Sequence, residues 1–337
     1  MSTTNRLWTL AARPQGMPKE ADFKLVEAPV GEPGEGEILV RLEYISVDPY
    51  MRRRMMDGPS YADPVQLGQL MVGAGVGKVL ASRNPKFAEG DTVEGFFGWQ
   101  THALSNGRGV RKIDPKLAPV STALYVLGMP GMTAYFGVMD ICKPQAGETM
   151  LVSGAGGAVG TLVGQIAKIQ GCRAVGIAGT DEKIDYIVND LGFDAGYNYR
   201  GVKDHVARQR ELCPDGIDSY FDNVGGEITD AAISLLNVGA RVALCGQISQ
   251  YNEESQSQGP RLLWQLITKQ VKMEGFLVYQ FASRWKEGLT QMAQWLQEGK
   301  LKYHEDIVEG IENTPSAFIG MLAGDNVGKR LIKLHAA

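Results

Sequence analysis

A glycine-rich segment, Leu151–Gly160, constrains the fold of this 337-residue chain more than any other feature. It joins a short apolar stretch typical of a strand, Thr149–Ser153, to Ala158–Ile169, whose apolar side chains share one helical face. Gly171 follows as the expected helix cap. Glycines in such a turn let the backbone approach a pyrophosphate, and the helix N-terminus adds unpaired N–H groups. The segment therefore predicts a dinucleotide site, with a purely structural turn as the alternative.

Beyond this turn, short apolar strands alternate with helices, which is typical of a parallel, doubly wound α/β sheet. Further strands are expected at Arg173–Ala178, Gly196–Tyr199, Ser219–Asp222, Arg241–Cys245 and Val271–Tyr279. Helices are expected at Asp181–Leu191, Val202–Leu212, Glu227–Leu236, Leu262–Lys269 and Ala282–Glu298.

The first third of the chain indicates a β-rich fold, because short apolar runs alternate with turn-forming residues. Strands are expected at Leu7–Leu10, Phe23–Val26, Ile38–Val47, Val72–Leu80 and Val93–Phe97. Glycines crowd residues 68–77, as in a small, tightly turned barrel. Residues 307–334 return to this character, with a helix around Pro315–Leu322 between two strands. We therefore predict a discontinuous domain, 1–128 with 305–337, and a second domain, 129–304.

Composition disfavours several classes of protein. The net charge of -4 argues against broad affinity for nucleic acid. No apolar run reaches the length of a membrane span, and the N-terminal residues lack the apolar core of a signal peptide, so we predict a cytoplasmic protein. The four cysteines, Cys142, Cys172, Cys213 and Cys245, form no C-x-x-C pair, and the histidines are equally dispersed. The sequence therefore predicts neither a disulfide framework nor a metal site.

The residues after the second strand of the alternating region favour NADPH over NADH. An NAD-preferring site usually places Asp or Glu at the end of that strand, where the carboxylate binds the ribose 2′-hydroxyl. Here Gly179 offers no carboxylate. Lys183, Tyr199 and Arg200 follow as candidates to bind a 2′-phosphate. The alternative is that Lys183 is an ordinary solvated charge on a helix.

Seven motifs make the chain resemble a known family. They are Asp48–Arg52, Pro85–Val93, Gly128–Tyr135, Phe221–Gly226, Cys245–Asn252, Gly275–Tyr279 and Gly324–Lys329. With these motifs the chain resembles the zinc-independent medium-chain dehydrogenases/reductases. Within them it resembles the prostaglandin reductase and alkenal reductase branch, and most closely the bacterial NADPH-dependent curcumin reductases. The resemblance covers nearly the whole chain, although the glycine loop departs from the alanine-rich stretch that is frequent in this branch. Gly73-Ala74-Gly75 stands where zinc-dependent relatives carry Gly-His-Glu, which removes a metal ligand.

The resemblance implies a Rossmann domain that binds NADPH and a GroES-like, β-rich barrel domain that carries catalysis. Lys183 and Tyr199 would hold the 2′-phosphate, and residues 276–278 would meet the nicotinamide through backbone groups. The substrate pocket is expected to include Tyr50, Met132 and Tyr279. Together with the glycine loop, the resemblance yields the expected cofactor-binding residues Thr133, Gly154, Gly156, Gly157, Ala158, Val159, Gly160, Gly179, Lys183, Tyr199, Asn223, Cys245, Ile248, Ser249, Phe276, Leu277, Val278 and Asn326.

The implied reaction is the NADPH-dependent reduction of the C=C bond of α,β-unsaturated ketones or aldehydes, such as curcumin-type enones, alkenals or 15-oxo-prostaglandin-like substrates. Hydride that reaches the β-carbon pushes negative charge onto the carbonyl oxygen, and without a metal a hydrogen-bond donor must stabilise that charge. A tyrosine is protonated at neutral pH and can donate. Tyr251 is the first candidate and Tyr61 the second, while ordinary packing is the alternative for either residue.

Three other functions remain open at this stage. They are a zinc-free quinone oxidoreductase, an alcohol dehydrogenase, which the missing metal site disfavours, and an NADPH-binding protein without activity. The expected partners are a small-molecule enone or enal and a second copy of the chain. The apolar run Val271–Tyr279 predicts a long strand at the sheet edge, and exposed edges invite pairing, so we predict a homodimer.

Overall fold

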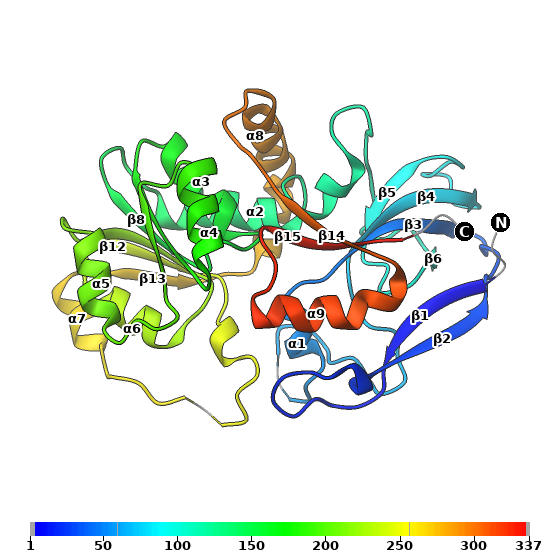
Figure 1. Cartoon of the computed structure of the whole chain (residues 1–337). Coiled ribbons are helices and arrows are strands. Elements are labelled where there is room, and N and C mark those ends of the chain that lie inside the picture. The colour runs from blue at the N-terminus through cyan, green and yellow to red at the C-terminus, as the bar shows by residue number, and fades with distance from the viewer. Residues whose placement is uncertain (1–3, 59, 256, 335–337) are drawn as a thin grey trace. The chain divides into compact units, whose positions relative to one another are not determined.

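Two compact units make up the computed structural model, which describes residues 4–58, 60–255 and 257–334 (Figure 1). Unit 1 contains Met1–Tyr125, Glu305–Asn326 and Arg330–Ala337. Unit 2 contains Val126–His304 and the short segment Val327–Lys329. The sequence places the first boundary at residue 128, and the return of Val327–Lys329 to unit 2 was not expected from it.

Unit 2 is built on a six-stranded parallel sheet in the order β10-β9-β8-β11-β12-β13. The order of strands reverses between β8 and β11, which is where open α/β sheets bind their ligands. The strands are β8 (Thr149–Ser153), β9 (Arg173–Ala178), β10 (Ala195–Asn198), β11 (Ile217–Asp222), β12 (Leu236–Leu244) and β13 (Lys272–Gly275). The prediction of a doubly wound parallel sheet is confirmed.

Helices cover both faces of this sheet, and Figure 1 shows α3 above the strands with α5 and α6 below them. The helix α3 packs on α2 and on strands β8 and β9, whereas α5 packs on α6. The helices are α2 (Met129–Phe136), α3 (Gly160–Ile169), α4 (Asp181–Asp185), α5 (His205–Leu212), α6 (Gly226–Ser234), α7 (Leu263–Thr268) and α8 (Trp285–Gln297). As expected, Gly171 follows α3 in a left-handed conformation, with φ of 81°.

The prediction of one long strand over Val271–Tyr279 is wrong for most of its length. The strand does lie at the sheet edge, but β13 ends at Gly275. Beyond that point Phe276 and Val278 are buried and stabilise the core, so the backbone leaves the edge, and a 3-10 helix begins at Val278. The apolar side chains of Phe276 and Val278 therefore marked burial in the core rather than a continued strand.

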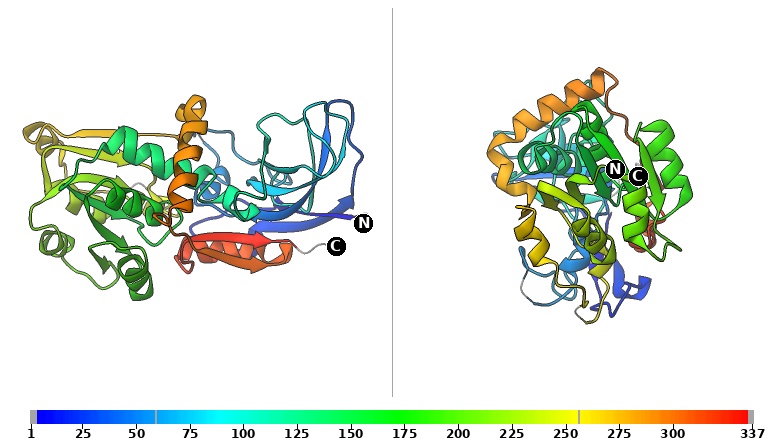
Figure 2. Two further views of the ribbon diagram at one scale, coloured as in Figure 1. Left: turned by 90° about the horizontal axis from the view of Figure 1, so that it is seen from above. Right: turned by 90° about the vertical axis from the view of Figure 1, so that its left-hand side faces the viewer.

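Unit 1 is β-rich, as predicted, and its main sheet has the order β14-β15-β3-β4-β5-β7, with β6 paired to β3. The C-terminal strand β15 runs antiparallel to β3, and Figure 2 shows the red C-terminal segment returning to the blue strands of this unit. The strands are β1 (Thr4–Leu10), β2 (Phe23–Pro29), β3 (Ile38–Ser46), β4 (Gly75–Ser82), β5 (Thr92–Gly95), β6 (His102–Ser105), β7 (Arg111–Lys112), β14 (Glu305–Glu309) and β15 (Lys329–Lys333). Two helices, α1 (Tyr50–Arg54) and α9 (Thr314–Ala323), complete it.

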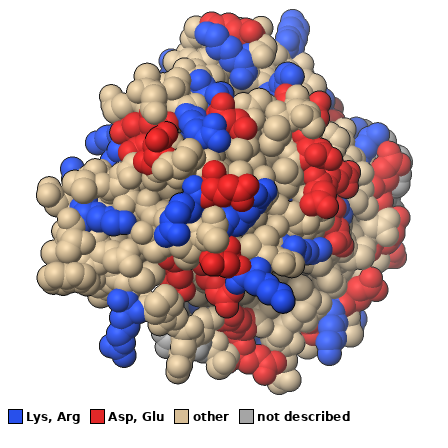
Figure 3. Space-filling view, turned by 60° about the vertical axis from the view of Figure 1, so that its left-hand side comes forward, with Lys and Arg blue, Asp and Glu red and all other residues tan. Residues whose placement is uncertain are grey.

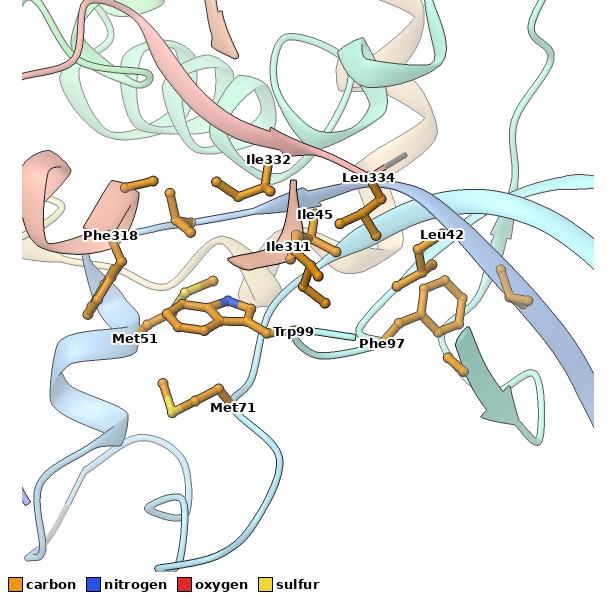
Figure 4. Packing of buried hydrophobic residues seen from close by; sticks show 14 of the residues in the cluster. Leu42, Ile45, Met51, Met71, Phe97, Trp99, Ile311, Phe318, Ile332 and Leu334 are labelled. Carbon is orange, nitrogen blue, oxygen red and sulfur yellow. The ribbon is translucent and has the colours of Figure 1, made fainter. Parts of the chain in front are cut away.

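The core of unit 1 is centred on Trp99, which is fully buried (Figure 4). Its ring stacks on Phe23 at a centroid distance of 5.5 Å and meets the edge of Phe318, also at 5.5 Å. Phe318 comes from α9, so the C-terminal segment completes this core. Such aromatic contacts add to the hydrophobic stabilisation from burial.

The surface carries charges of both signs, which intermingle on the face shown in Figure 3. This distribution agrees with the small net charge of -4. Within the part of the chain that the structure describes, every helix falls short of the length and apolarity that a membrane crossing requires.

Candidate cofactor and active site

The glycine loop between β8 and α3 is shaped by two positions that accept only glycine. Gly154 has φ of 62°, a left-handed conformation that disfavours other residues. A Cβ atom at Gly160 would lie 2.3 Å from the carbonyl oxygen of Gly154, so the first turn of the helix can approach the loop only without a side chain there. The loop closes on itself because the Gly157 N–H donates to the same oxygen at 3.1 Å.

The N-terminus of α3 lies directly after this loop. The helix begins at Gly160, and no side chain of its N-cap residue, Val159, caps it. Ala158 and Val159 are half-buried. Backbone N–H groups and the helix dipole at such a terminus attract an anionic group, as a pyrophosphate requires.

Gly156 and Gly179 make room for the two residues expected at the 2′-phosphate. A Cβ atom at Gly156 would lie 2.8–3.0 Å from the side chain of Lys183, which is buried against the loop. A Cβ atom at Gly179 would lie 3.2 Å from the Tyr199 hydroxyl. The side chain of Thr180 caps α4 by accepting from the backbone N–H of Lys183 at 3.3 Å. The fold thus brings a cation to the glycine loop and a phenol to Gly179, and Lys183 is buried, unlike an ordinary solvated charge.

Asn223 ties the end of β11 to the end of β8. Its side-chain amide donates to the Ser153 carbonyl oxygen at 2.8 Å, and its backbone N–H donates to the Ser153 hydroxyl at 3.0 Å. A Cβ atom at Gly154 would lie 3.2 Å from the Asn223 Cβ. Asn223 therefore lies against the glycine loop at the point where the strand order reverses.

The segment Val327–Lys329 is part of this arrangement, although sequence reasoning missed it. The Gly328 N–H donates to the Gly156 carbonyl oxygen at 2.8 Å, and Gly328 forms a parallel bridge with Gly157. With φ of 67° and a Cβ position 2.2 Å from the His304 carbonyl oxygen, Gly328 also has to be glycine. The signal that could have found it is the motif Gly324–Lys329, in which Gly328 follows the expected cofactor ligand Asn326.

The loop after β12 carries Tyr251 beside the Asn223 turn. Ile248 and Ser249 donate backbone N–H bonds to the carbonyl oxygens of Asn223 and Val224, at 3.3 and 3.1 Å. The half-buried Tyr251 phenol oxygen accepts from the Gln247 N–H at 3.5 Å. A phenol oxygen that accepts in this way keeps its own proton to donate.

Cys245 begins the same loop, and its raised thiol pKa disfavours a nucleophilic role. Burial, with the nearby charge of Asp222, raises the pKa of the Cys245 thiol to about 12. The thiol is therefore protonated at neutral pH, whereas a nucleophilic cysteine needs a thiolate. The place of Cys245 among the cofactor-binding residues stays a prediction.

The residues that are expected to contact the nicotinamide lie directly after β13 and on α2. Phe276 and Val278 are buried, with the Phe276 ring near Gly137, while Leu277 is exposed. The half-buried Thr133 donates its hydroxyl to the Met129 carbonyl oxygen at 2.8 Å, one turn earlier in the helix.

The two expected pocket residues of unit 2 differ in exposure. Met132 is fully buried, and a Cβ atom at Gly288 of α8 would lie 2.7 Å from its sulfur. Met132 therefore packs in the core beside α8, and its place in a substrate pocket stays a prediction. Tyr279 is half-exposed, and its hydroxyl approaches the Met129 sulfur at 3.9 Å.

Three other candidates belong to unit 1. Tyr50 is the first residue of α1 and is half-buried, and Tyr61 lies in the irregular segment that follows, with half of its surface exposed. Asn326 is buried after α9. Their parts in the site stay predictions.

Comparisons with known proteins show the family of the chain. Residues 6–113 match the family model described as N-terminal domain of oxidoreductase, and residues 158–295 match the one described as zinc-binding dehydrogenase. The chain is 44% identical to NADPH-dependent curcumin reductase of Escherichia coli (strain K12) over 335 residues, 98% of this chain and 97% of the relative. It is 43% identical to prostaglandin reductase 1 of Rattus norvegicus over 336 residues, 97% of this chain and 98% of the relative.

A solved structure resembles the whole chain. The crystal structure of CurA in complex with NADPH, from Vibrio vulnificus, matches with a TM-score of 0.94 at 44% identity, and covers 98% of this chain and 100% of that chain. The chain therefore belongs to the medium-chain dehydrogenase/reductase family, in the branch that holds the prostaglandin, alkenal and curcumin reductases. The family resemblance inferred from the seven sequence motifs is confirmed.

Proposed function

We propose that this protein is an NADPH-dependent reductase of the C=C bond of α,β-unsaturated ketones and aldehydes. The observation that carries the proposal is the placement of Lys183 against Gly156 of the glycine loop and of Tyr199 against Gly179, since this pair suits a dinucleotide with a 2′-phosphate. Whole-length similarity to an NADPH-dependent curcumin reductase and to prostaglandin reductase 1 supports the same reaction class. Unit 2 then binds the cofactor, and unit 1 supplies substrate-binding residues.

Each part of unit 2 has a role toward the cofactor. The loop Gly154–Gly160 and the start of α3 receive the pyrophosphate through backbone N–H groups. Lys183 and Tyr199 bind the 2′-phosphate by charge and hydrogen bond. Asn223 and residues 276–278 line the groove toward the nicotinamide, with Thr133 beside it. NADPH, when bound, supplies the hydride for the reaction.

Tyr251 is the proposed donor to the substrate carbonyl oxygen. As the β-carbon becomes saturated, negative charge develops on that oxygen, and a phenol O–H stabilises it by a hydrogen bond. A phenol oxygen that accepts from the Gln247 N–H can also donate its own proton. The α-carbon then takes a proton from solvent or from the tyrosine. Tyr61 is the second candidate for this donor, and Tyr50, Met132 and Tyr279 are proposed to bound the substrate.

Product identity tests the proposal. The protein is mixed with NADPH and a panel of enones, enals and quinones, and both NADPH loss and products are followed. We expect the saturated ketone or aldehyde. An allylic alcohol as the main product rejects the ene-reductase function, turnover confined to quinones favours the quinone oxidoreductase, and NADPH binding without turnover favours a non-catalytic role.

We further propose a homodimer that pairs at the β13 edge of unit 2. The helix α7, which leads into β13, exposes three apolar side chains, Leu263, Trp264 and Ile267, at 73%, 71% and 67%. Neighbouring apolar side chains in water are typical of an interaction surface. Light scattering should give a particle of about twice 36.6 kDa, whereas a 36.6 kDa particle at micromolar concentration contradicts the proposal.

Independence from zinc and a cytoplasmic location are also proposed. Ala74 stands where zinc-dependent relatives carry a histidine ligand, although the family model that matches residues 158–295 is described as zinc-binding dehydrogenase. Across the described residues no three His, Cys, Asp or Glu side chains gather as a metal ion requires. Cell fractionation tests the location, and metal analysis tests the zinc.

A further inference from the structure

The carboxylate of Asp222 is a fully buried charge at the end of β11. One oxygen accepts from the Ser153 hydroxyl at 3.0 Å, and from the backbone N–H groups of Val224 and Gly225 at 2.9 Å each. The Tyr220 hydroxyl donates to this oxygen at 2.9 Å, and burial, together with the charge of Asp222, raises the pKa of Tyr220 and so keeps that proton in place. A buried carboxylate needs such donors to offset its desolvation.

The second carboxylate oxygen reaches two further elements. It accepts from the Thr229 hydroxyl of α6 at 2.8 Å and from the Gln247 side-chain amide at 3.5 Å. The backbone carbonyl of Asp222 also accepts, from the N–H groups of Cys245 and Gly246 at 2.8 and 3.1 Å. One residue thereby holds the end of β8, where the glycine loop begins, and the loops that follow β11 and β12.

These three loops are the ones that the proposed function assigns to cofactor and substrate. Ser153 is the last residue of β8 and precedes the glycine loop, the turn at Val224 and Gly225 precedes α6, and Gln247 belongs to the Tyr251 loop. Ser153 also accepts from the Asn223 N–H while it donates to Asp222, so a single hydroxyl joins the carboxylate to two loops. Small displacements of groups that bind a ligand cost much of its affinity.

We propose that Asp222 is a positioning residue for the cofactor: its carboxylate, acting through Ser153, fixes the glycine loop against the Asn223 turn and so sets the affinity for NADPH. The inference rests on the proposed NADPH-dependent function. A residue that served folding alone would lower the midpoint of urea unfolding and leave the NADPH Kd of the folded protein unchanged.

The experiment measures the NADPH Kd by nucleotide fluorescence, with the urea midpoint from circular dichroism, for wild type, Asp222→Asn, Ser153→Ala and the double variant. Asp222→Asn should raise the Kd by about tenfold, and Ser153→Ala by about threefold, as expected for lost hydrogen bonds to a charged group. The double variant should match Asp222→Asn within about twofold, because coupled residues are not additive. Ser219→Ala is the matched control, since its buried hydroxyl lies on the same strand and has no hydrogen-bond partner in the described residues; its Kd should match wild type.

A Kd for Asp222→Asn within twofold of wild type, whatever the urea midpoint, overturns the inference, as does full additivity in the double variant. If Asp222→Asn does not fold, Ser153→Ala decides alone, and an unchanged Kd there also overturns it. If the wild type does not bind NADPH, the proposed function is overturned, and the inference with it. If the wild type binds NADPH and Asp222→Asn binds it equally well, only the inference is overturned.

Discussion

The two units of this protein differ in how far apart in the sequence their contacting segments lie. In unit 2 the strands and helices follow one another within Val126–His304, and only Val327–Lys329 arrives from elsewhere. In unit 1 the core joins Phe23 and Trp99 to Phe318, more than two hundred positions later in the chain. In unit 2 polar hydrogen bonds gather where parallel strands end, whereas the aromatic cluster of unit 1 joins segments that are far apart in the chain. The difference teaches that the turns around the cofactor site follow strand ends within one stretch of the chain, whereas unit 1 needs a distant segment to complete its core.

Replacement of Trp99 should have the largest effect, because it removes the centre of the unit 1 core. Trp99→Ala should lower the free energy of unfolding by about 3–5 kcal/mol, as buried aromatic-to-alanine changes do. Urea unfolding followed by circular dichroism measures this, and NADPH fluorescence should give a Kd unchanged within about twofold in the protein that remains folded.

Trp99→Phe is the matched control. It fills most of the space and removes an indole N–H that, within the described residues, has no hydrogen-bond partner. The stability loss should therefore be well below that of Trp99→Ala. A loss of NADPH binding in soluble Trp99→Ala would break the comparison, because the two units would then not act separately.

Tyr251→Phe tests whether the hydrogen-bond donor to the substrate is Tyr251 of unit 2 or Tyr61 of unit 1. It should keep the fold and NADPH binding and lower kcat by about 10-fold or more, as loss of a donor to a developing oxyanion does. Steady-state kinetics at saturating NADPH measures the effect, with Tyr61→Phe as the paired variant, which should change kcat less. The opposite ranking would move the donor to unit 1, and an unchanged kcat in both would assign the role to a cofactor hydroxyl or to water.

Lys183→Ala tests whether the cofactor preference comes from unit 2 alone. Loss of a cation from a phosphate site should raise KM for NADPH about tenfold or more and leave KM for NADH nearly unchanged. Lys300→Ala removes an exposed lysine of the same unit and serves as the control. An equal rise for both nucleotides would remove Lys183 from the 2′-phosphate site.

Metal removal should have the smallest effect. Because Gly73-Ala74-Gly75 of unit 1 lacks the Gly-His-Glu ligand, a chelator should leave the rate of enone reduction unchanged. Elemental analysis should find less than one zinc per chain. Tightly bound zinc whose removal abolishes turnover would overturn the metal-free mechanism.

Much of unit 2 could be predicted from the sequence because its signals are local. The strand Thr149–Ser153 and the strand Arg173–Ala178 have the predicted bounds, and the helix after the glycine loop begins two positions later than expected. The exception is Val271–Tyr279, where an apolar run contains a short edge strand and then core residues. The pattern of apolar residues predicts which side chains are buried. It does not show whether a buried segment pairs with a neighbouring strand or only packs against the sheet.

For the site, the sequence by itself determined the glycine loop and the missing carboxylate at Gly179, because both lie at strand ends with fixed spacing, and the family resemblance of Cys245–Asn252 indicated Tyr251. Only the tertiary structure decided that Lys183 lies on Gly156, that Gly328 closes the loop from the far end of the chain, and that Asp222 gathers three loops on one carboxylate. These contacts join residues that are remote in sequence, and a hydrogen bond or a close approach between them depends on how the strands are ordered in the sheet. No spacing within a single segment carries that information.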